Sequence, residues 1–211
     1  IYDWIDDLSV FPYDQNFLAR LHRRALGEAN IVASVARRLH EQASTIRSDA
    51  IYLPNAVEQG RFETPPNPNP ARSDLDLADC LASGKPIAGY YGALAEWFDY
   101  DLLLKTANLR PDWNFVLIGP DYDQSIGRSR ITRQANVYWI GPRPYSELPG
   151  YLHLFNVAII PFKINDITLA TSPLKLYEYF AGGKLVITTP MPECMAFPEV
   201  QIISTAEEFA A

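Results

Sequence analysis

The chain has 211 residues, of which 48% are hydrophobic, and its formal net charge is −7. This length and composition fit a globular protein with a substantial core, arranged as one large domain or two smaller ones. The acidic balance argues against a general nucleic-acid-binding protein, because contacts to phosphates need a basic surface. Cys80 and Cys194 lie far apart without ligand spacing, so the sequence indicates neither a disulfide scaffold nor a zinc site.

Apolar runs in the sequence stay shorter than the roughly 18 residues of a membrane-spanning helix. No signal-peptide pattern is visible. The chain opens on IYDWI, which is typical of a strand in the middle of a fold. We therefore expect an N-terminal portion of the native protein to be absent.

The first 60 residues alternate short apolar runs with helical patterns. The spacing predicts strands at 1–5, 30–36 and 50–58, and helices at 16–27 and 37–43. Six arginines make this segment locally basic. A solvated helix face is the simplest explanation of these arginines, and contact with anionic lipid headgroups is the alternative.

A proline-rich stretch separates this segment from the rest of the chain. Prolines and a scarcity of large apolar residues mark it as an extended linker that passes into a short helix at 73–83. We therefore predict a first domain at 1–60, a linker at 61–86 and a second domain at 87–211.

From Ile87 onward, continuous apolar runs alternate with segments long enough for helices. These runs predict strands at 87–92, 114–119, 136–141, 156–161, 184–189 and 200–204. Runs that are apolar throughout are typical of strands buried on both faces, so an α/β fold with a parallel sheet is expected. Most of them end at Gly or Pro, and ligands of open α/β sheets bind at the carboxyl ends of the strands. The turns at 119–120, 141–142 and 161 are therefore predicted to share one rim.

One stretch, TLATSPLKLYEYFAGGKLVITTPMPE from Thr168 onward, predicts a binding site at a helix N-terminus. Thr171 and Ser172 are candidate N-caps, and a double glycine ends the helix. Unpaired N–H groups and the positive end of the helix dipole favour a phosphate there. Lys175 adds a cation in the first turn, and Glu178 lies one turn further along the same face. The pattern predicts a diphosphate at the helix tip and a sugar hydroxyl on the carboxylate.

This segment resembles the nucleotide-sugar site of GT-B glycosyltransferases, in particular the bacterial group related to family 4. In that group the pattern SPLKxxEYxAxGKPVV binds the donor, and its glutamate typically contacts the nucleotide ribose, a role that would fall to Glu178. The resemblance extends from Ile1 to Glu199 and implies two Rossmann-like domains. Residues 87–211 would bind the nucleotide sugar, and residues 1–60 would be the end of the acceptor-side domain. Family 4 enzymes often carry a second glutamate eight residues earlier, where this chain has Ala170.

Two loops on the expected rim add further candidates. Gly92 ends the first strand of the second domain and lets a ligand phosphate approach the backbone. Many family members carry an Arg and a Lys after it, whereas residues 93–99 contain no cation. Lys175 and the helix dipole would then hold the diphosphate largely alone, or another cation would contribute. Arg143 is one candidate for this cation and could instead stack or pair with the base, while an ordinary surface turn is the alternative.

Asp6 falls near the strand end where the family often has a catalytic or acceptor-site histidine. A carboxylate there could accept the proton of the acceptor hydroxyl, and an N-cap or turn role is the alternative for both Asp6 and Asp7. Asp74 and Asp76 have the Asp-x-Asp spacing expected of a metal-dependent GT-A enzyme, but they lie in the linker and not at the end of a buried strand. No metal site is therefore expected.

The resemblance implies a glycosyltransferase of glycan or polysaccharide biosynthesis. It would transfer a sugar from a UDP- or GDP-sugar to a hydroxyl of a glycan or lipid-linked acceptor, with retention of configuration and without a metal or other cofactor. The expected location is cytoplasmic, with peripheral membrane contact at the cytoplasmic face as an extension. A sugar-nucleotide 2-epimerase of the same fold and a non-catalytic nucleotide-sugar-binding module are the alternatives. An NAD-dependent oxidoreductase is disfavoured, because no G-x-G-x-x-G opens the first βα turn.

Overall fold

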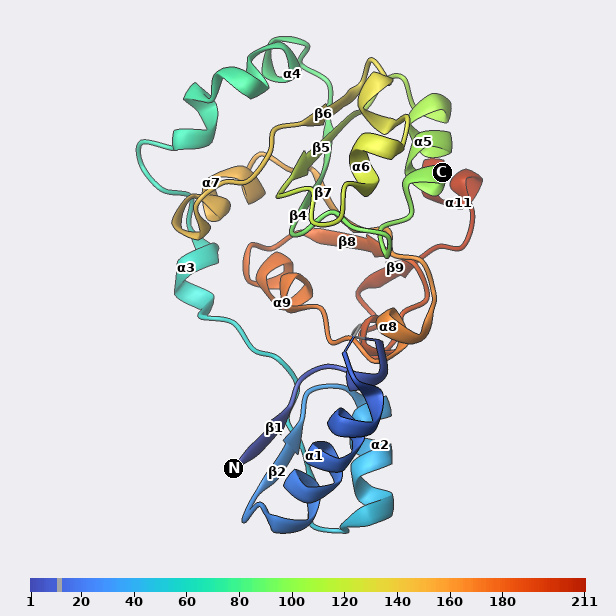
Figure 1. Ribbon diagram of the computed structural model, residues 1–211. Helices are drawn as coiled ribbons and strands as arrows, with labels where there is room; N and C mark the ends of the chain where they lie inside the picture. Colours follow the sequence, from blue (N-terminus) through green and yellow to red (C-terminus); the bar gives the residue numbers. More distant parts are fainter. Residues whose placement is uncertain (11–12) are drawn as a thin grey trace.

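The computed structural model describes residues 1–10 and 13–211 (Figure 1). Its strands form two separate sheets, and every strand pairing within them is parallel. The smaller sheet has the order β1-β2-β3, and the larger has the order β6-β5-β4-β7-β8-β9. We refer to the parts built on these sheets as the small half and the large half.

In the part of the chain that the structure describes, the small half consists of three short strands with two helices and a 3₁₀ turn. Its elements are β1 (Tyr2–Trp4), η1 (Leu8–Val10), α1 (Gln15–Glu28), β2 (Val32–Ser34), α2 (Arg37–Ile46) and β3 (Ile51–Tyr52). The strands and helices predicted here are confirmed. Asp14 caps α1, because its side chain accepts a hydrogen bond of 3.0 Å from the Phe17 N–H. A separate small core, which includes Trp4, Leu26 and Leu39, holds the helices on the sheet.

The large half carries the predicted parallel sheet, and all six of its predicted strands are confirmed. The strands are β4 (Ile87–Tyr91), β5 (Asn114–Ile118), β6 (Val137–Trp139), β7 (Val157–Ile160), β8 (Leu185–Thr188) and β9 (Val200–Ile202). The chain runs outward from β4 to β6, returns, and runs outward again from β7 to β9. The order therefore reverses between β4 and β7, and ligands of such sheets bind at the carboxyl ends beside this reversal.

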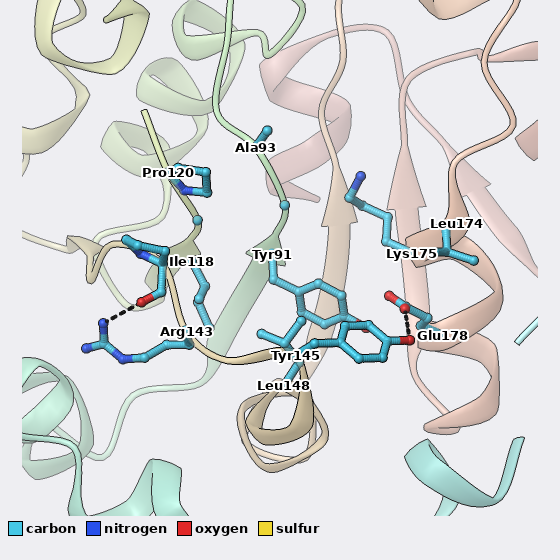
Figure 2. A pocket seen from close by; sticks show the side chains of 13 residues that line it. Tyr91, Ala93, Ile118, Pro120, Arg143, Tyr145, Leu148, Leu174, Lys175 and Glu178 are labelled. Atoms are coloured by element: carbon cyan, nitrogen blue, oxygen red, sulfur yellow. Dashed lines mark hydrogen bonds between the residues drawn. The ribbon is translucent and has the colours of Figure 1, made fainter. Parts of the chain in front are cut away.

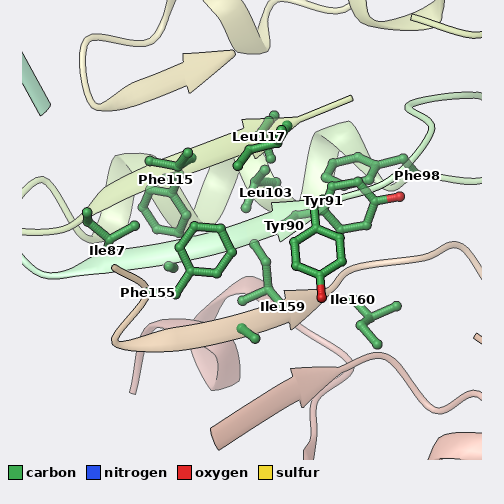
Figure 3. Packing of buried hydrophobic residues seen from close by; sticks show 14 of the residues in the cluster. Ile87, Tyr90, Tyr91, Phe98, Leu103, Phe115, Leu117, Phe155, Ile159 and Ile160 are labelled. Atoms are coloured by element: carbon green, nitrogen blue, oxygen red, sulfur yellow. The ribbon is translucent and has the colours of Figure 1, made fainter. Parts of the chain in front are cut away.

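Helices and 3₁₀ turns connect the strands of the large half. They are α5 (Tyr100–Leu109), α6 (Ser125–Arg128), η4 (Ile131–Arg133), η5 (Tyr145–Glu147), α7 (Leu148–Leu152), α8 (Asp166–Leu169), α9 (Leu174–Ala181), α10 (Pro192–Met195) and α11 (Ala206–Ala210). The core between sheet and helices is dense with large side chains (Figure 3). Phe155 packs so closely over β4 that a Cβ at Gly89 would lie 2.3 Å from its ring. Only glycine fits there.

The segment between the two sheets differs from the extended linker predicted for it. It forms α3 (Gln59–Glu63), η2 (Pro70–Ser73), η3 (Leu75–Leu77) and α4 (Ala78–Ala82), which follow the edge of the large half in Figure 1. Phe62, Ala71 and Leu77 are buried in the large core. The short helix predicted at 73–83 is confirmed by η3 and α4. The extended linker predicted before it was wrong, because apolar side chains such as Phe62 and Ala71 hold this part of the chain against the large half.

Contacts between residues distant in sequence join the two halves. The Glu193 carboxylate accepts hydrogen bonds from the Arg37 N–H at 2.5 Å and from the Tyr52 hydroxyl at 2.6 Å. The Asn55 side-chain amide donates to the Ser172 carbonyl at 2.7 Å. Ala170, just before α9, packs into the core of the small half. The loop that leads into α9 is therefore positioned by both halves.

None of the helices in the described ranges combines the length and apolar character needed to cross a bilayer.

Candidate functional site

Helix α9 projects its first turn toward the rim of the large sheet. The helix begins at Leu174, and the residue in the N-cap position is Pro173, which has no side chain able to cap. The expected capping by Thr171 and Ser172 was therefore wrong. The C-terminal prediction is confirmed, because the helix ends at Ala181 and Gly183 adopts the left-handed φ of +65°. The Leu176 N–H donates to the Pro173 carbonyl at 3.0 Å, so the N–H groups of Leu174 and Lys175, which no side chain caps, are the ones that a ligand at the tip would meet.

A cavity of about 270 Å³ lies in front of this helix tip, and we call it the tip cavity (Figure 2). Residues after β4, β5 and β6 line one side, and α9 lines the other. Four of the residues predicted to bind the nucleotide sugar border it: Gly92, Arg143, Lys175 and Glu178. Residues up to 86 positions apart in the chain are thus brought to one place.

Two glycines make the strand ends of this cavity unusually compact. Gly92 and Gly119 have φ values of +139° and +147°, which side-chain-bearing residues rarely adopt. A Cβ on Gly119 would lie 1.8 Å from the Gly92 carbonyl oxygen. The Gly119 N–H also donates to the Gly141 carbonyl at 2.9 Å, so the predicted 119–120 and 141–142 turns do share one rim. Because the strand ends at Gly92 and Gly119 pack this closely against each other, space for a ligand is left beside them.

Lys175 lies at the reversal of strand order. Its Nζ lies 5.3 Å from the ring centroid of Tyr90 on β4 and 5.0 Å from that of Phe162 after β7. Burial lowers the pKa of Lys175 to about 8, although nearby Glu178 acts in the opposite direction. The ammonium is held between ring faces by cation–π attraction. A bound anion would stabilise its charged form.

Glu178 is 3% exposed, although it lies near the start of α9. The segment after β6 reaches it. From this segment the Tyr145 hydroxyl donates a hydrogen bond of 2.7 Å to the Glu178 Oε1 (Figure 2). Burial, and then the hydrogen bond to Glu178, raise the pKa of Tyr145 to about 12, so the phenol stays a donor at neutral pH. The carboxylate is thereby oriented at the wall of the tip cavity.

Arg143 borders the cavity, but its guanidinium points away from Lys175 and Glu178 (Figure 2). Nε donates to Asp74 at 2.9 Å, and the same guanidinium binds Asp76 and the Tyr151 hydroxyl. Asp74 and Asp76 therefore anchor the η3 turn to the large half. This arrangement leaves Arg143 no free charge for a diphosphate.

The remaining predicted site residues lie elsewhere. Thr171 lines a neighbouring cavity, where its hydroxyl donates to the Ile167 carbonyl at 2.7 Å. Ser172 is buried and borders neither cavity. Asp6 lines the same neighbouring cavity as Thr171, and partial burial raises the pKa of its carboxyl. The Asp7 carboxylate accepts hydrogen bonds from Ser9, which is the turn role given as the alternative.

This neighbouring cavity has a volume of about 510 Å³ and shares Ala93 and Lys175 with the tip cavity. We call it the aromatic cavity, after the side chains of Tyr90, Trp97, Tyr122 and Phe162 that line it. These four aromatic residues were not predicted from the sequence. The sequence does mark them, since each lies in or shortly after a predicted strand whose carboxyl end was expected at the rim.

The fold and the site together define a class of protein. The two parallel α/β sheets, with a cavity beside the strand-order reversal of the larger one, have the GT-B fold of glycosyltransferases, as similarity to solved structures shows. The family model described as "Glycosyl transferases group 1" matches residues 79–197, more than half of the chain. The chain belongs to this family.

One curated relative is similar over most of the chain. It is TuaH of Bacillus subtilis (strain 168), a glycosyltransferase assigned to teichuronic acid biosynthesis. It is 28% identical over an alignment of 207 residues that covers 91% of this chain and 50% of the relative. The chain thus spans about half the length of the curated relative it matches.

Solved structures show the same fold at low sequence identity. Anabaena Alr3699/HepE in complex with UDP and glucose aligns with a TM-score of 0.70 at 17% identity, over 99% of this chain and 59% of that protein. Sucrose-phosphate synthase from Thermosynechococcus elongatus aligns with a TM-score of 0.65 at 19% identity, over 94% of this chain and 51% of that protein.

Proposed function

We propose that this chain is the donor-binding part of a glycosyltransferase that transfers a sugar from a nucleoside-diphosphate donor to an acceptor hydroxyl. The observation that carries the proposal is the tip cavity, where the Lys175 ammonium, the Glu178 carboxylate and the free amides of α9 converge. A cation and amide donors suit a diphosphate, and an oriented carboxylate suits the paired hydroxyls of a ribose. Family membership supports the same function.

Each residue then has a distinct task in catalysis. Lys175 and the first turn of α9 stabilise the negative charge that grows on the departing diphosphate. Gly92 lets the phosphates lie against the backbone, since a Cβ there would lie 2.9 Å from the Lys175 Cε. Glu178, oriented by Tyr145, fixes the nucleoside so that the sugar is presented in one geometry. Asp6, whose pKa burial raises, accepts the proton of the attacking hydroxyl.

The finer features of the reaction belong to this proposal. We expect the reaction to proceed with retention. We also expect it to proceed without a metal, because Lys175 and the helix dipole supply the positive charge that a diphosphate needs. The first donor to try is UDP-glucose, because HepE, which has a similar fold, was crystallised with UDP-glucose. We place the enzyme in the cytoplasm, with the exposed Arg20 and Arg23 of α1 as the arginines that would meet anionic lipid headgroups.

Variants at Glu178 test the ribose assignment. Glu178→Gln should weaken nucleoside diphosphate binding by about ten- to a hundred-fold, because hydrogen bonds to a charged group contribute roughly 1.5–3 kcal/mol. The loss should be similar for nucleoside, monophosphate and diphosphate, since all three carry the ribose. Calorimetry measures these affinities for UDP, GDP and ADP and for the corresponding monophosphates and nucleosides, with and without EDTA.

The matched control is Lys175→Met, which should instead weaken diphosphate binding more than nucleoside binding. Both variants are compared with the parent by circular dichroism to show that they fold. A Glu178→Gln protein that binds all three ligands as the parent does would refute the ribose assignment. Loss of binding on adding EDTA would refute metal independence.

A further inference from the structure

The aromatic cavity has one wall formed by two ring faces that solvent can reach. Trp97, after β4, and Tyr122, after β5, have ring centroids 5.8 Å apart and planes inclined by 43°. Trp97 is partly buried, and Tyr122 is 70% exposed. Exposure of large aromatic faces to water is unfavourable, and a ligand that covers them would remove this cost.

Backbone hydrogen bonds hold this wall from both sides. The Tyr122 N–H donates to the Leu94 carbonyl at 2.9 Å, which ties the β5 loop to the β4 loop. The Lys163 N–H donates to the Trp97 carbonyl at 2.8 Å, which ties the β4 loop to the segment after β7. Because the backbone of both residues is already held, a ligand would spend little free energy on ordering the two loops.

The wall stands beside the place where the proposed reaction occurs. The aromatic cavity shares Lys175 with the tip cavity, so a diphosphate on Lys175 would present its sugar at the boundary between them. Asp6 and Val10 line the same cavity from the small half. The group that occupies the cavity therefore meets the donor sugar on one side and a carboxylate on the other, which is the position of the acceptor.

The side chains that line the aromatic cavity indicate which chemical class of ligand would bind there. Besides its aromatic rings it offers the hydroxyl-bearing residues Thr168 and Thr171 and the two charged groups Asp6 and Lys175. A pyranose ring has an apolar face of C–H bonds and an edge of hydroxyl groups, which matches flat rings combined with a few polar groups. The volume of about 510 Å³ exceeds the 270 Å³ of the tip cavity and leaves room beyond the transferred sugar.

We propose that Trp97 and Tyr122 stack against a sugar ring of the acceptor, so that the acceptor is a saccharide at its accepting end. This assignment rests on the proposed function of the tip cavity. A polar cavity that also borders Trp97 includes Ser125, Lys163 and Asn165 in its lining. A saccharide longer than one ring would pass Trp97 and meet these hydrogen-bonding groups.

Saturation-transfer NMR on the whole chain tests the proposal. The probes are glucose, N-acetylglucosamine, glucuronate and cellobiose, each added to protein saturated with UDP or with whichever of GDP and ADP binds instead. We expect transfer to the C–H protons of at least one probe. Trp97→Ala should weaken its binding about ten-fold, which corresponds to about 1.4 kcal/mol, and Tyr122→Ala should weaken it less.

Trp113→Ala is the matched control, because Trp113 is also partly buried but precedes β5 at the opposite edge of the sheet. It should leave saccharide binding unchanged. Trp97→Phe keeps a flat ring and should retain most of the binding, which guards against a Trp97→Ala protein that fails to fold. Nucleotide affinity, measured by calorimetry, should be the same in all four variants.

The outcomes separate this proposal from the function on which it rests. The proposal is overturned if no probe binds a protein that does bind nucleotide, or if Trp97→Ala and Trp113→Ala behave alike. It is also overturned if Trp97→Ala weakens nucleotide binding as much as saccharide binding, since the wall would then belong to the nucleotide site. Saccharide binding that depends on Trp97 in a protein without nucleotide affinity would refute the tip-cavity assignment and leave the wall intact.

Discussion

At the scale of single residues, the charge of Lys175 is the feature most sensitive to conditions. Burial lowers its pKa to about 8, so the ammonium dominates below that pH and the neutral amine above it. A diphosphate needs the ammonium, and binding it raises the pKa of Lys175. Diphosphate affinity should therefore fall as pH rises above 8, by up to about ten-fold per pH unit. Calorimetry with UDP between pH 7 and 10 measures the slope.

Two variants show whether this slope belongs to Lys175. Lys175→Arg keeps a cation at every pH in this range and should bind with little pH dependence, because the arginine pKa stays above about 12. Lys175→Met should bind weakly at every pH and also lose the slope. An unchanged slope in Lys175→Met would assign the titration to another group.

At the scale of an element, the strand-ending glycines determine how closely the loops of the rim pack. Gly119→Ala should destabilise the protein by roughly 1–3 kcal/mol from the backbone conformation alone, since φ is +147°. The clash with the Gly92 carbonyl should also displace the β4 loop and weaken nucleotide binding. Urea denaturation followed by calorimetry measures both effects.

Gly27→Ala provides the matched control for this substitution. Gly27 lies within α1, and a Cβ there would meet nothing within 4 Å. Alanine should stabilise the helix by roughly 0.5–1 kcal/mol and leave nucleotide binding unchanged. If Gly119→Ala were tolerated as well as Gly27→Ala, close backbone packing would not be what shapes the rim.

At the scale of the whole molecule, the buried Glu193 joins the two halves. We propose that these halves are domains with the boundaries 1–60 and 87–211, and that 61–86, although it packs against the large half, is the connection between them. Glu193→Ala should lower the free energy of unfolding by about 3 kcal/mol, because it removes two hydrogen bonds to a charged group and leaves the Tyr52 hydroxyl unpaired. Amide exchange at Arg37, the first residue of α2, should become faster. Urea denaturation and hydrogen exchange measure these changes.

Arg38→Ala is the comparison for this variant, because it breaks another contact between the halves. The ion pair of Arg38 with Asp166 is 3.0 Å long and largely exposed. Its loss should cost less than about 1 kcal/mol. If both variants lowered the free energy of unfolding equally, burial of Glu193 would add nothing to the stability of the contact between the two halves.

Local patterns in the sequence determined much of this protein. Continuous apolar runs predicted the six strands of the large sheet, because a buried parallel strand needs apolar residues on both faces. Helical spacing placed Lys175 and Glu178 on one face of α9, and Gly or Pro at strand ends predicted the rim. These features depend on neighbours within a few residues, which a sequence displays directly.

Only the tertiary structure decided which partner each functional side chain takes. Arg143 was a candidate cation for the diphosphate, but its guanidinium donates a hydrogen bond to Asp74, 69 positions earlier in the chain. Lys175 lies between the ring of Tyr90 on β4 and that of Phe162 after β7. Glu193 binds the first N–H of a helix 156 positions away. The charge and burial of a side chain depend on such long-range neighbours, and the spacing of residues within one helix or strand does not reveal them. For that physical reason the sequence predicted where the site lies, while the fold determined which of its charges are free to bind a ligand.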